Sequence, residues 1–401
     1  MNILIRTIGI YIILTILVGC KKDTGISKVA EAGMTYNNAL PKPVITAISP
    51  SKGTIYGAVK ITGSGFSTVV NGNIVRFNGI PATVNSFTST EIVATVPANA
   101  STGNITVLSN DFTATSPAPF KILKYVPNGK LAINLDGLTE VAISKTGVIY
   151  GVIKRADKFA QIIKYTNGAS TVIFNNAPEF KDQLNYFEHE YKGLLVSQAG
   201  EVYFASNYIN NRSVNGTITR TVLQSHIVKI NTAGQASLVA GADAGAVDGN
   251  GANARFRNIE AMAMDAAGNI YVSDFGNSRL RKVTPSADVT TLPAAVKIKR
   301  LAISAGGDLY FHDNNKVYSV NAATRRVSVI AGPYANGLGN MLFDAEGNLL
   351  VNQRTSILVI NKANFGSEVK LPAITFAIAV DADRKLLTFT SKGVTRYALT
   401  E

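Results

Sequence analysis

The sequence of 401 residues has one cysteine, no tryptophan and only three histidines. With Cys20 as the single thiol, neither an internal disulfide nor a site built on several thiolates can form. The histidines, His189, His226 and His312, lie in separate sequence contexts and show none of the spacings of histidine metal motifs, so we expect no histidine-rich metal site. The absence of tryptophan removes the side chain with the largest stacking surface for sugars.

The apolar run near the N-terminus is too short to cross a membrane. It covers residues 7–18, whereas a helix needs about 20 apolar residues to span the hydrocarbon core. Arg6 precedes the run and Leu-Val-Gly-Cys ends it at Cys20, which predicts a signal peptide over residues 1–19. These four residues resemble the lipobox of bacterial lipoproteins. The resemblance implies lipidation of Cys20 and, with Lys21 next to it, an outer-membrane lipoprotein that faces either the cell surface or the periplasm.

Charged residues make up only 16% of the chain, whereas hydrophobic residues make up 46% and there are 34 glycines. This composition is typical of a folded all-β protein. The net charge of +13 favours acidic polysaccharide or anionic lipid as a partner, and for an exported protein it does not indicate nucleic acid.

Two regions that differ in amino-acid composition follow the predicted signal peptide. Residues 20–42 have few large apolar side chains and predict a lipidated flexible tether. Residues 43–123 hold about seven short β-branched runs separated by glycine and proline, which predicts a small β-sandwich. The segments PVITAISPSKGTIYGAVKITGSGF, VRFNGIPATV and EIVATVPANASTGNITV resemble the IPT/TIG family of immunoglobulin-like domains. That resemblance implies a fold and says little about function.

Residues 124–401 contain an internal repeat. Six copies of an alternating strand, a turn and an aliphatic-aromatic pair occur, among them AMAMDAAGNIYVSD and LAISAGGDLYFHD. Their common spacing near 40 residues suits a four-stranded propeller blade and predicts a six-bladed β-propeller. The third copy, FRNIEAMAMDAAGNIYVSDFGNSRLRKV, resembles the NHL-repeat propellers.

The last copy has room for only three strands before Glu401. A fourth strand must therefore come from elsewhere in the chain. We predict that residues 130–135 close the ring as a strand beside residues 395–399, which would remove an open sheet edge.

Long insertions around the second blade give the candidate binding surface. Residues 175–192 and 207–225 are interpreted as long loops beside the loop over residues 243–258, and blade stability does not require them. Aromatic side chains with asparagine and arginine can stack on sugars or peptides and hydrogen-bond their edges. The predicted ligand-binding residues are Tyr186, Phe187, Tyr191, Tyr208, Asn210, Arg212 and Arg257.

The sequence indicates a binding module more than an enzyme, and no catalytic residue is assigned. We expect the ligand to be a polysaccharide, with an envelope protein as the alternative partner in a scaffold. A calcium-assisted hydrolase or lyase is the second alternative, because Asp274 and Asp313 follow second strands and are placed to approach the central channel of a propeller. No other cofactor is expected.

Overall fold

The computed structural model describes residues 40–401, with gaps at 56, 132, 134–136, 155–159, 167–168, 177–178, 181–184, 215, 294–296, 322–325, 336, 345–346, 361–365, 372–374, 384 and 391–392. Cys20, the predicted signal peptide and residues 21–39 of the tether lie outside the described residues. Within the described part, no helix is long and apolar enough to cross a membrane. Two 3-10 turns, η1 (Gly251–Asn253) and η2 (Phe275–Asn277), interrupt an otherwise all-β chain.

The N-terminal domain is a sandwich of two four-stranded sheets. One sheet has the order β1-β3-β7-β6 and the other has the order β5-β4-β8-β9. The short β2 and β10 form a parallel pair. The strands are β1 (Val44–Ser49), β2 (Lys52–Gly53), β3 (Ala58–Ser64), β4 (Asn73–Phe77), β5 (Ile80–Pro81), β6 (Thr83–Phe87), β7 (Glu91–Thr95), β8 (Ile105–Ser109), β9 (Phe112–Thr115) and β10 (Lys121–Ile122).

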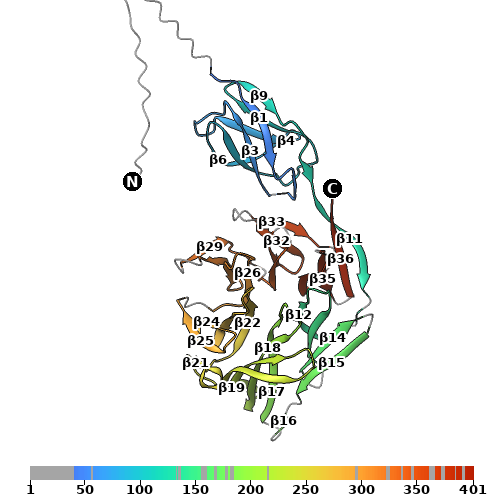
Figure 1. Cartoon of the computed structure of the whole chain (residues 1–401), viewed down its shortest axis with the longest axis vertical. Helices are drawn as coiled ribbons and strands as arrows, with labels where there is room; N and C mark the ends of the chain where they lie inside the picture. The colour runs from blue at the N-terminus through green and yellow to red at the C-terminus, as the bar shows by residue number, and fades with distance from the viewer. Residues whose placement is uncertain are drawn as a thin grey trace, which may run out of the picture. The chain divides into compact units, whose positions relative to one another are not determined.

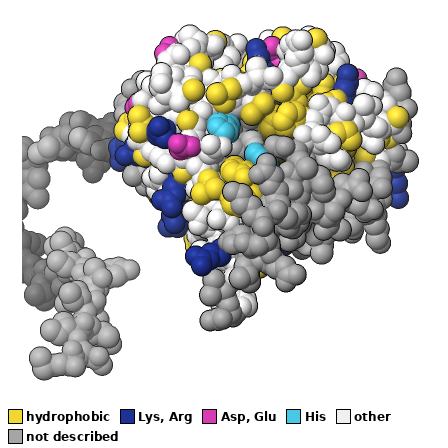
Figure 2. All heavy atoms as spheres, turned by 90° about the horizontal axis from the view of Figure 1, so that it is seen from below, with side chains coloured by type: hydrophobic (Ala, Val, Ile, Leu, Met, Phe, Trp, Pro, Cys, Tyr) yellow, Lys and Arg dark blue, Asp and Glu magenta, His cyan; other side chains and the backbone are white. Residues whose placement is uncertain are grey.

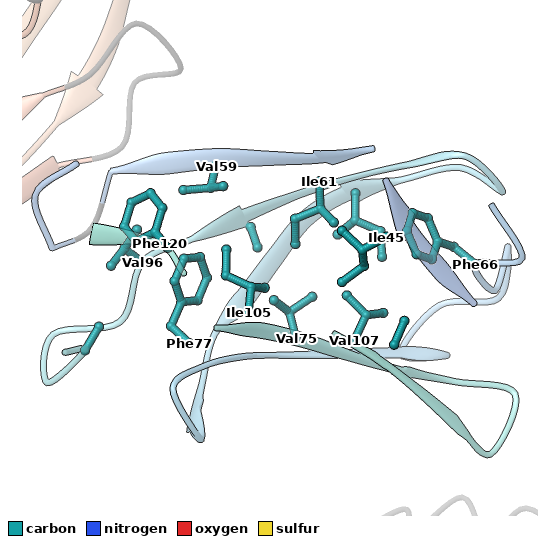
Figure 3. Packing of buried hydrophobic residues seen from close by; sticks show 14 of the residues in the cluster. Ile45, Val59, Ile61, Phe66, Val75, Phe77, Val96, Ile105, Val107 and Phe120 are labelled. Atoms are coloured by element: carbon teal, nitrogen blue, oxygen red, sulfur yellow. The ribbon is translucent and has the colours of Figure 1, made fainter. Parts of the chain in front are cut away.

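Alternation along each strand explains the core of this sandwich. Ile61 of β3 and Val75 of β4 are fully buried, whereas their neighbours along the strands turn outward. Figure 3 shows these side chains meeting between the two sheets, and Phe77 packs edge-on against Phe120 with ring centroids 5.3 Å apart. One apolar cluster therefore holds both sheets together.

Six further sheets follow one another as the blades of a ring (Figure 1). Blade 1 is β12 (Leu138–Ile143), β13 (Ile149–Lys154), β14 (Ala160–Thr166) and β15 (Ala169–Asn176). Blade 2 is β16 (Glu179–Phe180), β17 (Asn185–Val196), β18 (Val202–Val214), β19 (Thr217–Ile230) and β20 (Ala236–Asp243). Blade 3 is β22 (Ile259–Met264), β23 (Ile270–Asp274), β24 (Arg279–Val283), β25 (Asp288–Leu292) and, outermost, β21 (Gly249–Asn250).

The remaining three blades have four strands each. Blade 4 is β26 (Arg300–Ile303), β27 (Leu309–His312), β28 (Val317–Val320) and β29 (Val327–Ala331). Blade 5 is β30 (Met341–Phe343), β31 (Leu349–Asn352), β32 (Ser356–Ile360) and β33 (Gly366–Lys370). Blade 6 is β34 (Ala377–Val380), β35 (Leu386–Thr390), β36 (Gly393–Thr400) and β11 (Lys124–Leu131). The innermost strand of each blade contacts that of the next, and β34 contacts β12, so the ring is complete. The predicted all-β fold, a sandwich followed by a six-bladed propeller, is confirmed.

The ring closes through β11, which pairs antiparallel with β36. Lys130 lies opposite Thr395 and Leu131 opposite Val394, as the prediction required, but the strand begins six residues earlier, at Lys124. Tyr125 and Val126 continue the pairing toward the C-terminus of the chain, where they face Leu399 and Ala398. Closure by an N-terminal strand is therefore confirmed, with the described strand over residues 124–131, whereas residues 132, 134 and 135 of the predicted strand lie outside the described residues.

The insertions in blade 2 were predicted to be loops, and this prediction is wrong. Their described residues are mostly strands. Residues 185–192 extend β17, residues 207–214 extend β18 and residues 217–225 extend β19. The strict alternation Phe187-Glu188-His189-Glu190-Tyr191 favours a strand, because each face of a sheet receives every second residue. The three long strands form the blade-2 extension, which we define as residues 185–191, 207–214 and 217–225 (β17 and β19 in Figure 1).

Loss of β11 should open the ring. Replacing residues 124–131 by a Gly/Ser/Pro segment of the same length removes every side chain that β11 contributes and disfavours its pairing with β36. We expect the propeller transition to lose its cooperativity or to fall by many degrees in scanning calorimetry. Replacing the exposed residues 216–219 in the same way is the control and should leave the transition in place. An unchanged transition in the first variant would contradict closure by β11.

Candidate functional site

The blade-2 extension presents two chemically different faces. Successive residues of a strand point to opposite sides, so Phe187 and His189 share one face with Tyr208, which lies opposite His189. We call this the aromatic face. Glu188 and Glu190 project from the other side, which we call the charged face.

Three rings form a contiguous platform on the aromatic face. The Phe187 and Tyr208 rings are stacked, with centroids 5.4 Å apart and 20° between their planes. The His189 ring lies 4.9 Å from that of Tyr208. Phe187 is buried, whereas His189 and Tyr208 are half-buried. In this platform (Phe187, His189 and Tyr208), the buried Phe187 is the anchor, and the half-buried His189 and Tyr208 are the members that reach solvent.

A second row of polar side chains crosses the same face. Ser206 of β18 lies opposite His226 of β19, and its Oγ is 2.9 Å from Nδ1 of His189. Figure 2 shows histidine side chains near one another among apolar and charged atoms. Burial lowers the pKa of His226, and the neighbouring Asp243 carboxylate opposes this shift. The strand register therefore gathers two of the three histidines, which the sequence contexts alone had kept apart.

The charged face is a network of ion pairs. The buried carboxylate of Glu188 lies 3.2 Å from Lys154 Nζ of blade 1 and accepts a hydrogen bond from Asn211 Nδ2. Arg220 lies 3.5 Å from Glu188 and 3.4 Å from Glu190. Because these groups neutralise one another, the network ties the extension to blade 1 and is not a free anionic site.

The predicted ligand-binding residues of β17 lie in different environments. Tyr191 is only 2% exposed and packs in the core between blades 1 and 2, with its ring 5.0 Å from that of Phe204. Burial raises the pKa of the Tyr191 hydroxyl, which has no hydrogen-bond partner among the described residues. The structure therefore places Tyr191 in the core instead of on the binding surface. Tyr186 lies opposite Asn211, and its side chain is outside the described residues.

The polar residues of the predicted site do not all lie beside the platform. Asn210 lies directly opposite Phe187, beside the platform, and its buried Oδ1 has no partner among the described residues. Arg212 is exposed near the tip of β18. Arg257 is exposed in blade 3, just before Asn258, whose backbone N–H donates to Ser225 Oγ. Since Ser225 alternates with His226, Arg257 borders the opposite face of β19, and the structure does not bring it to the platform.

Asp274 belongs to a buried structural network. Its Oδ2 lies 2.9 Å from Nη1 of Arg281, and its Oδ1 accepts the backbone N–H of Arg257 at 2.8 Å. Asn277 donates to both carboxylate oxygens. The second Nη of Arg281 pairs with Asp248, and its guanidinium lies over the Phe256 ring. These contacts use the carboxylate to hold the loop before β22 against blade 3.

Asp313 is occupied in a similar way. Its Oδ1 accepts the backbone N–H groups of Asn315 and Lys316, and its Oδ2 accepts the hydroxyl of Tyr318 at 2.7 Å. In the described part of the chain, no three acidic, histidine or cysteine side chains are grouped closely enough to hold a metal ion. Asp274 and Asp313 each bind neighbouring protein groups. The calcium site remains an untested prediction.

Polar side chains on the second strands of blades 2 to 5 tie each of these blades to the next one. Asn207 Nδ2 donates to Ile259 O, Ser273 Oγ to Ile298 O, and Asn352 Nδ2 to Thr375 O. His312 occupies this position in blade 4, where its Nε2 lies 2.6 Å from Gly339 O and its Nδ1 accepts the N–H of Asn314. These four polar side chains therefore help to hold the ring together.

Ion pairs connect the innermost strands of three blades. Arg300 of β26 lies 3.3 Å from Glu140 of β12 and 3.5 Å from Glu260 of β22, so it joins three blades. Burial raises the pKa of Glu140, and Arg300 opposes this shift. Glu140 and Arg300 line a cavity of about 220 Å³, together with residues that include Met262 and Phe343. The cavity is smaller than typical ligand pockets, and its charged groups are already paired.

Comparison with known proteins identifies the first domain. Residues 43–122 match the family model of the IPT/TIG domain. These residues are an IPT/TIG domain. No curated protein matches the chain. The likeness of the later repeats to NHL repeats stays a prediction.

Solved structures with a similar fold share little sequence with this chain. An auxiliary nutrient binding protein from Bacteroides ovatus is 13% identical, with 91% of this chain and 99% of that chain covered at a TM-score of 0.47. Another auxiliary nutrient binding protein, from Bacteroides thetaiotaomicron, is 11% identical over 90% and 99% of the two chains, with a TM-score of 0.44. Virginiamycin B lyase from Staphylococcus aureus is 13% identical over 69% and 100%, with a TM-score of 0.46. Similarity at this level gives no argument about activity.

Removing the buried guanidinium of Arg281 should destabilise blade 3. Arg281→Ala leaves the carboxylate of Asp274 buried without its cation, a change that typically costs about 3–5 kcal/mol. Arg279→Ala, on the same strand but with an exposed hydrogen bond to Ala246 O, is the matched control and should cost less than about 1 kcal/mol. Denaturant unfolding measures both values. Equal effects of the two substitutions would contradict the role given to Arg281.

The stability of the propeller should depend on pH through His312. Burial lowers its pKa from 6.5 to about 4, so the folded state keeps the ring neutral. The resulting stabilisation is complete above pH 6.5 and is lost as the pH falls toward 4, by about 2 kcal/mol between pH 7 and pH 5. His312→Asn supplies an amide N–H donor for Gly339 O, in the way that Asn352 donates to Thr375 O in blade 5. Because asparagine does not titrate, this variant should lose less stability between pH 7 and pH 5 than the wild-type protein. Parallel pH dependence in both proteins would rule out His312 as the cause.

Proposed function

We propose that the protein is an exported, non-catalytic polysaccharide-binding protein, anchored through a lipid on Cys20, and that the platform receives an acidic sugar chain. The observation that carries the proposal is the stacked pair of Phe187 and Tyr208 with His189 beside it on one sheet face. The pyranose rings of sugars present apolar C–H faces, and aromatic rings held in a fixed plane are suited to pack against them. Phe187 is buried and fixes the plane, and the half-buried Tyr208 adds a second ring that carries a hydroxyl.

Polar groups next to the platform suit the hydroxyl and carboxylate groups of an acidic sugar. Arg212 is exposed on the same strand as Tyr208 and supplies a guanidinium that can bind a carboxylate in bidentate fashion. The half-buried Asn210 adds an amide whose oxygen has no partner among the described residues. The net charge of +13 attracts polyanions to the protein as a whole. An acidic polysaccharide therefore fits these groups better than a neutral one.

Loss of the Tyr208 ring should weaken binding. In isothermal titration calorimetry with polygalacturonate at low salt, we expect Tyr208→Ala to weaken the affinity about tenfold, which corresponds to about 1.4 kcal/mol. Tyr208→Phe keeps the ring and is the matched control, with a change of less than about threefold. Arg212→Gln should weaken binding and also reduce its dependence on salt concentration.

Three outcomes would count against this proposal. Equal binding of polygalacturonate and neutral dextran would contradict a preference for acidic sugars. Full affinity in Tyr208→Ala would move the site away from the platform. If no polysaccharide binds and a single envelope protein is retained instead, the protein is a scaffold and the proposed function fails.

A further inference from the structure

The outer edge of the blade-2 extension is a bare strand. Strand β19 runs from Thr217, whereas its pairing with β20 begins only at Gln224, opposite Asp243. Residues 217–221 are all exposed, and Ile218 is 58% exposed. On the side away from β18, no described strand pairs with residues 217–222. The backbone groups that point to this side are therefore open to another strand.

The outermost strand of every blade has an edge, but the other edges are protected. The pairings that place β11, β15, β20 and β29 each contain a bulge, which twists an edge away from regular pairing. Strand β25 is partly covered by β21, and β33 contains Glu368 and Lys370. In β19, pairing with β18 is regular from Thr217 to Val222, and a bulge follows only before Gln224. The segment contains no proline, and its one charged side chain, Arg220, pairs with Glu188 and Glu190 of the same sheet. Residues 217–222 are therefore a regularly paired segment whose outer side meets no described strand.

We propose that this edge pairs antiparallel with the same edge of a second copy of the chain, so that two extensions form one continuous sheet. The sequence of the edge, Thr217-Ile218-Thr219-Arg220-Thr221, is nearly symmetric about Thr219. A two-fold axis through Thr219 places threonine opposite threonine at 217, 219 and 221, which are favourable cross-strand pairs. The proposal does not depend on the proposed function.

Charge selects this register over the neighbouring one. A two-fold axis through Arg220 would place two guanidinium groups directly opposite each other, which is destabilising. With the axis at Thr219, Arg220 faces Ile218 of the second copy and keeps its contacts with Glu188 and Glu190 of its own chain. Residues 217–222 contain no carboxylate, so they do not attract a basic peptide strand. The edge is thus self-complementary.

The pairing would bring two binding faces together. A two-fold axis perpendicular to the sheet keeps both aromatic faces on the same side of the joined sheet. A long polymer could then contact both platforms, and bivalent attachment strengthens binding without any new contact.

Sedimentation velocity of the full chain tests the pairing. We expect the wild-type chain to sediment as a dimer and Thr219→Lys, which places two ammonium groups opposite each other, to weaken the dimer at least about tenfold. Thr171→Lys, on the exposed edge of β15, is the matched control and should leave the dimer intact. Melting temperatures of both variants should match wild type. A wild-type monomer, or a dimer that Thr219→Lys does not weaken, would overturn the proposal.

Disulfide trapping tests the register. Thr219→Cys places the two thiols directly opposite each other across the two-fold axis, and we expect a crosslinked dimer on mild oxidation. Ile218→Cys is the control, because residue 218 then faces residue 220 of the second copy and its thiols lie farther apart. Equal crosslinking of both variants, or none in Thr219→Cys, would overturn the register.

Discussion

Ring closure is the constraint on which the rest of the propeller depends. Blades 1 to 5 are each built from one continuous stretch of chain, but blade 6 takes its outer strand from residues 124–131. The pairing of β11 with β36 converts a row of blades into a ring in which β34 contacts β12. Polar ties such as the hydrogen bond from His312 to Gly339 O then connect neighbouring blades within the closed ring. An open row would leave two apolar blade faces in water.

The frame and the candidate site are separate in this molecule. The residues that the frame needs are buried and paired: Asp274 with Arg281 inside blade 3, and Arg300 with Glu140 between blades 4 and 1. The platform lies outside the ring on strands that are longer than a blade needs. The exposed residues of the extension can change without loss of the ring, because the contacts to the neighbouring blades come from its base, where Tyr191 packs against blade 1 and Asn207 donates to Ile259 O of blade 3.

The sequence allowed the fold to be predicted because its signals are local and repeated. The turn glycines, such as Gly268 and Gly307, and the strands beside them recur at blade spacing, and the missing strand of the last repeat required β11. The site was harder to predict, because pairing partners far apart in the sequence define it. His189 and His226 meet only through the register of β17, β18 and β19 with Ser206 between them. Tyr191 was placed at the surface because a long insertion was interpreted as a loop, whereas alternation on a strand sends its ring into the core.

Excision of the extension tests most directly whether the ring and the binding surface are separate. Residues 208–224 would be replaced by an Asn-Gly turn that joins Asn207 to Ser225, which keeps the tie between blades 2 and 3. Calorimetry and polygalacturonate binding would then be measured on the same protein. This account predicts a melting temperature within a few degrees of wild type and loss of binding. A ring that unfolds with the excision, or binding that survives it, would contradict the account.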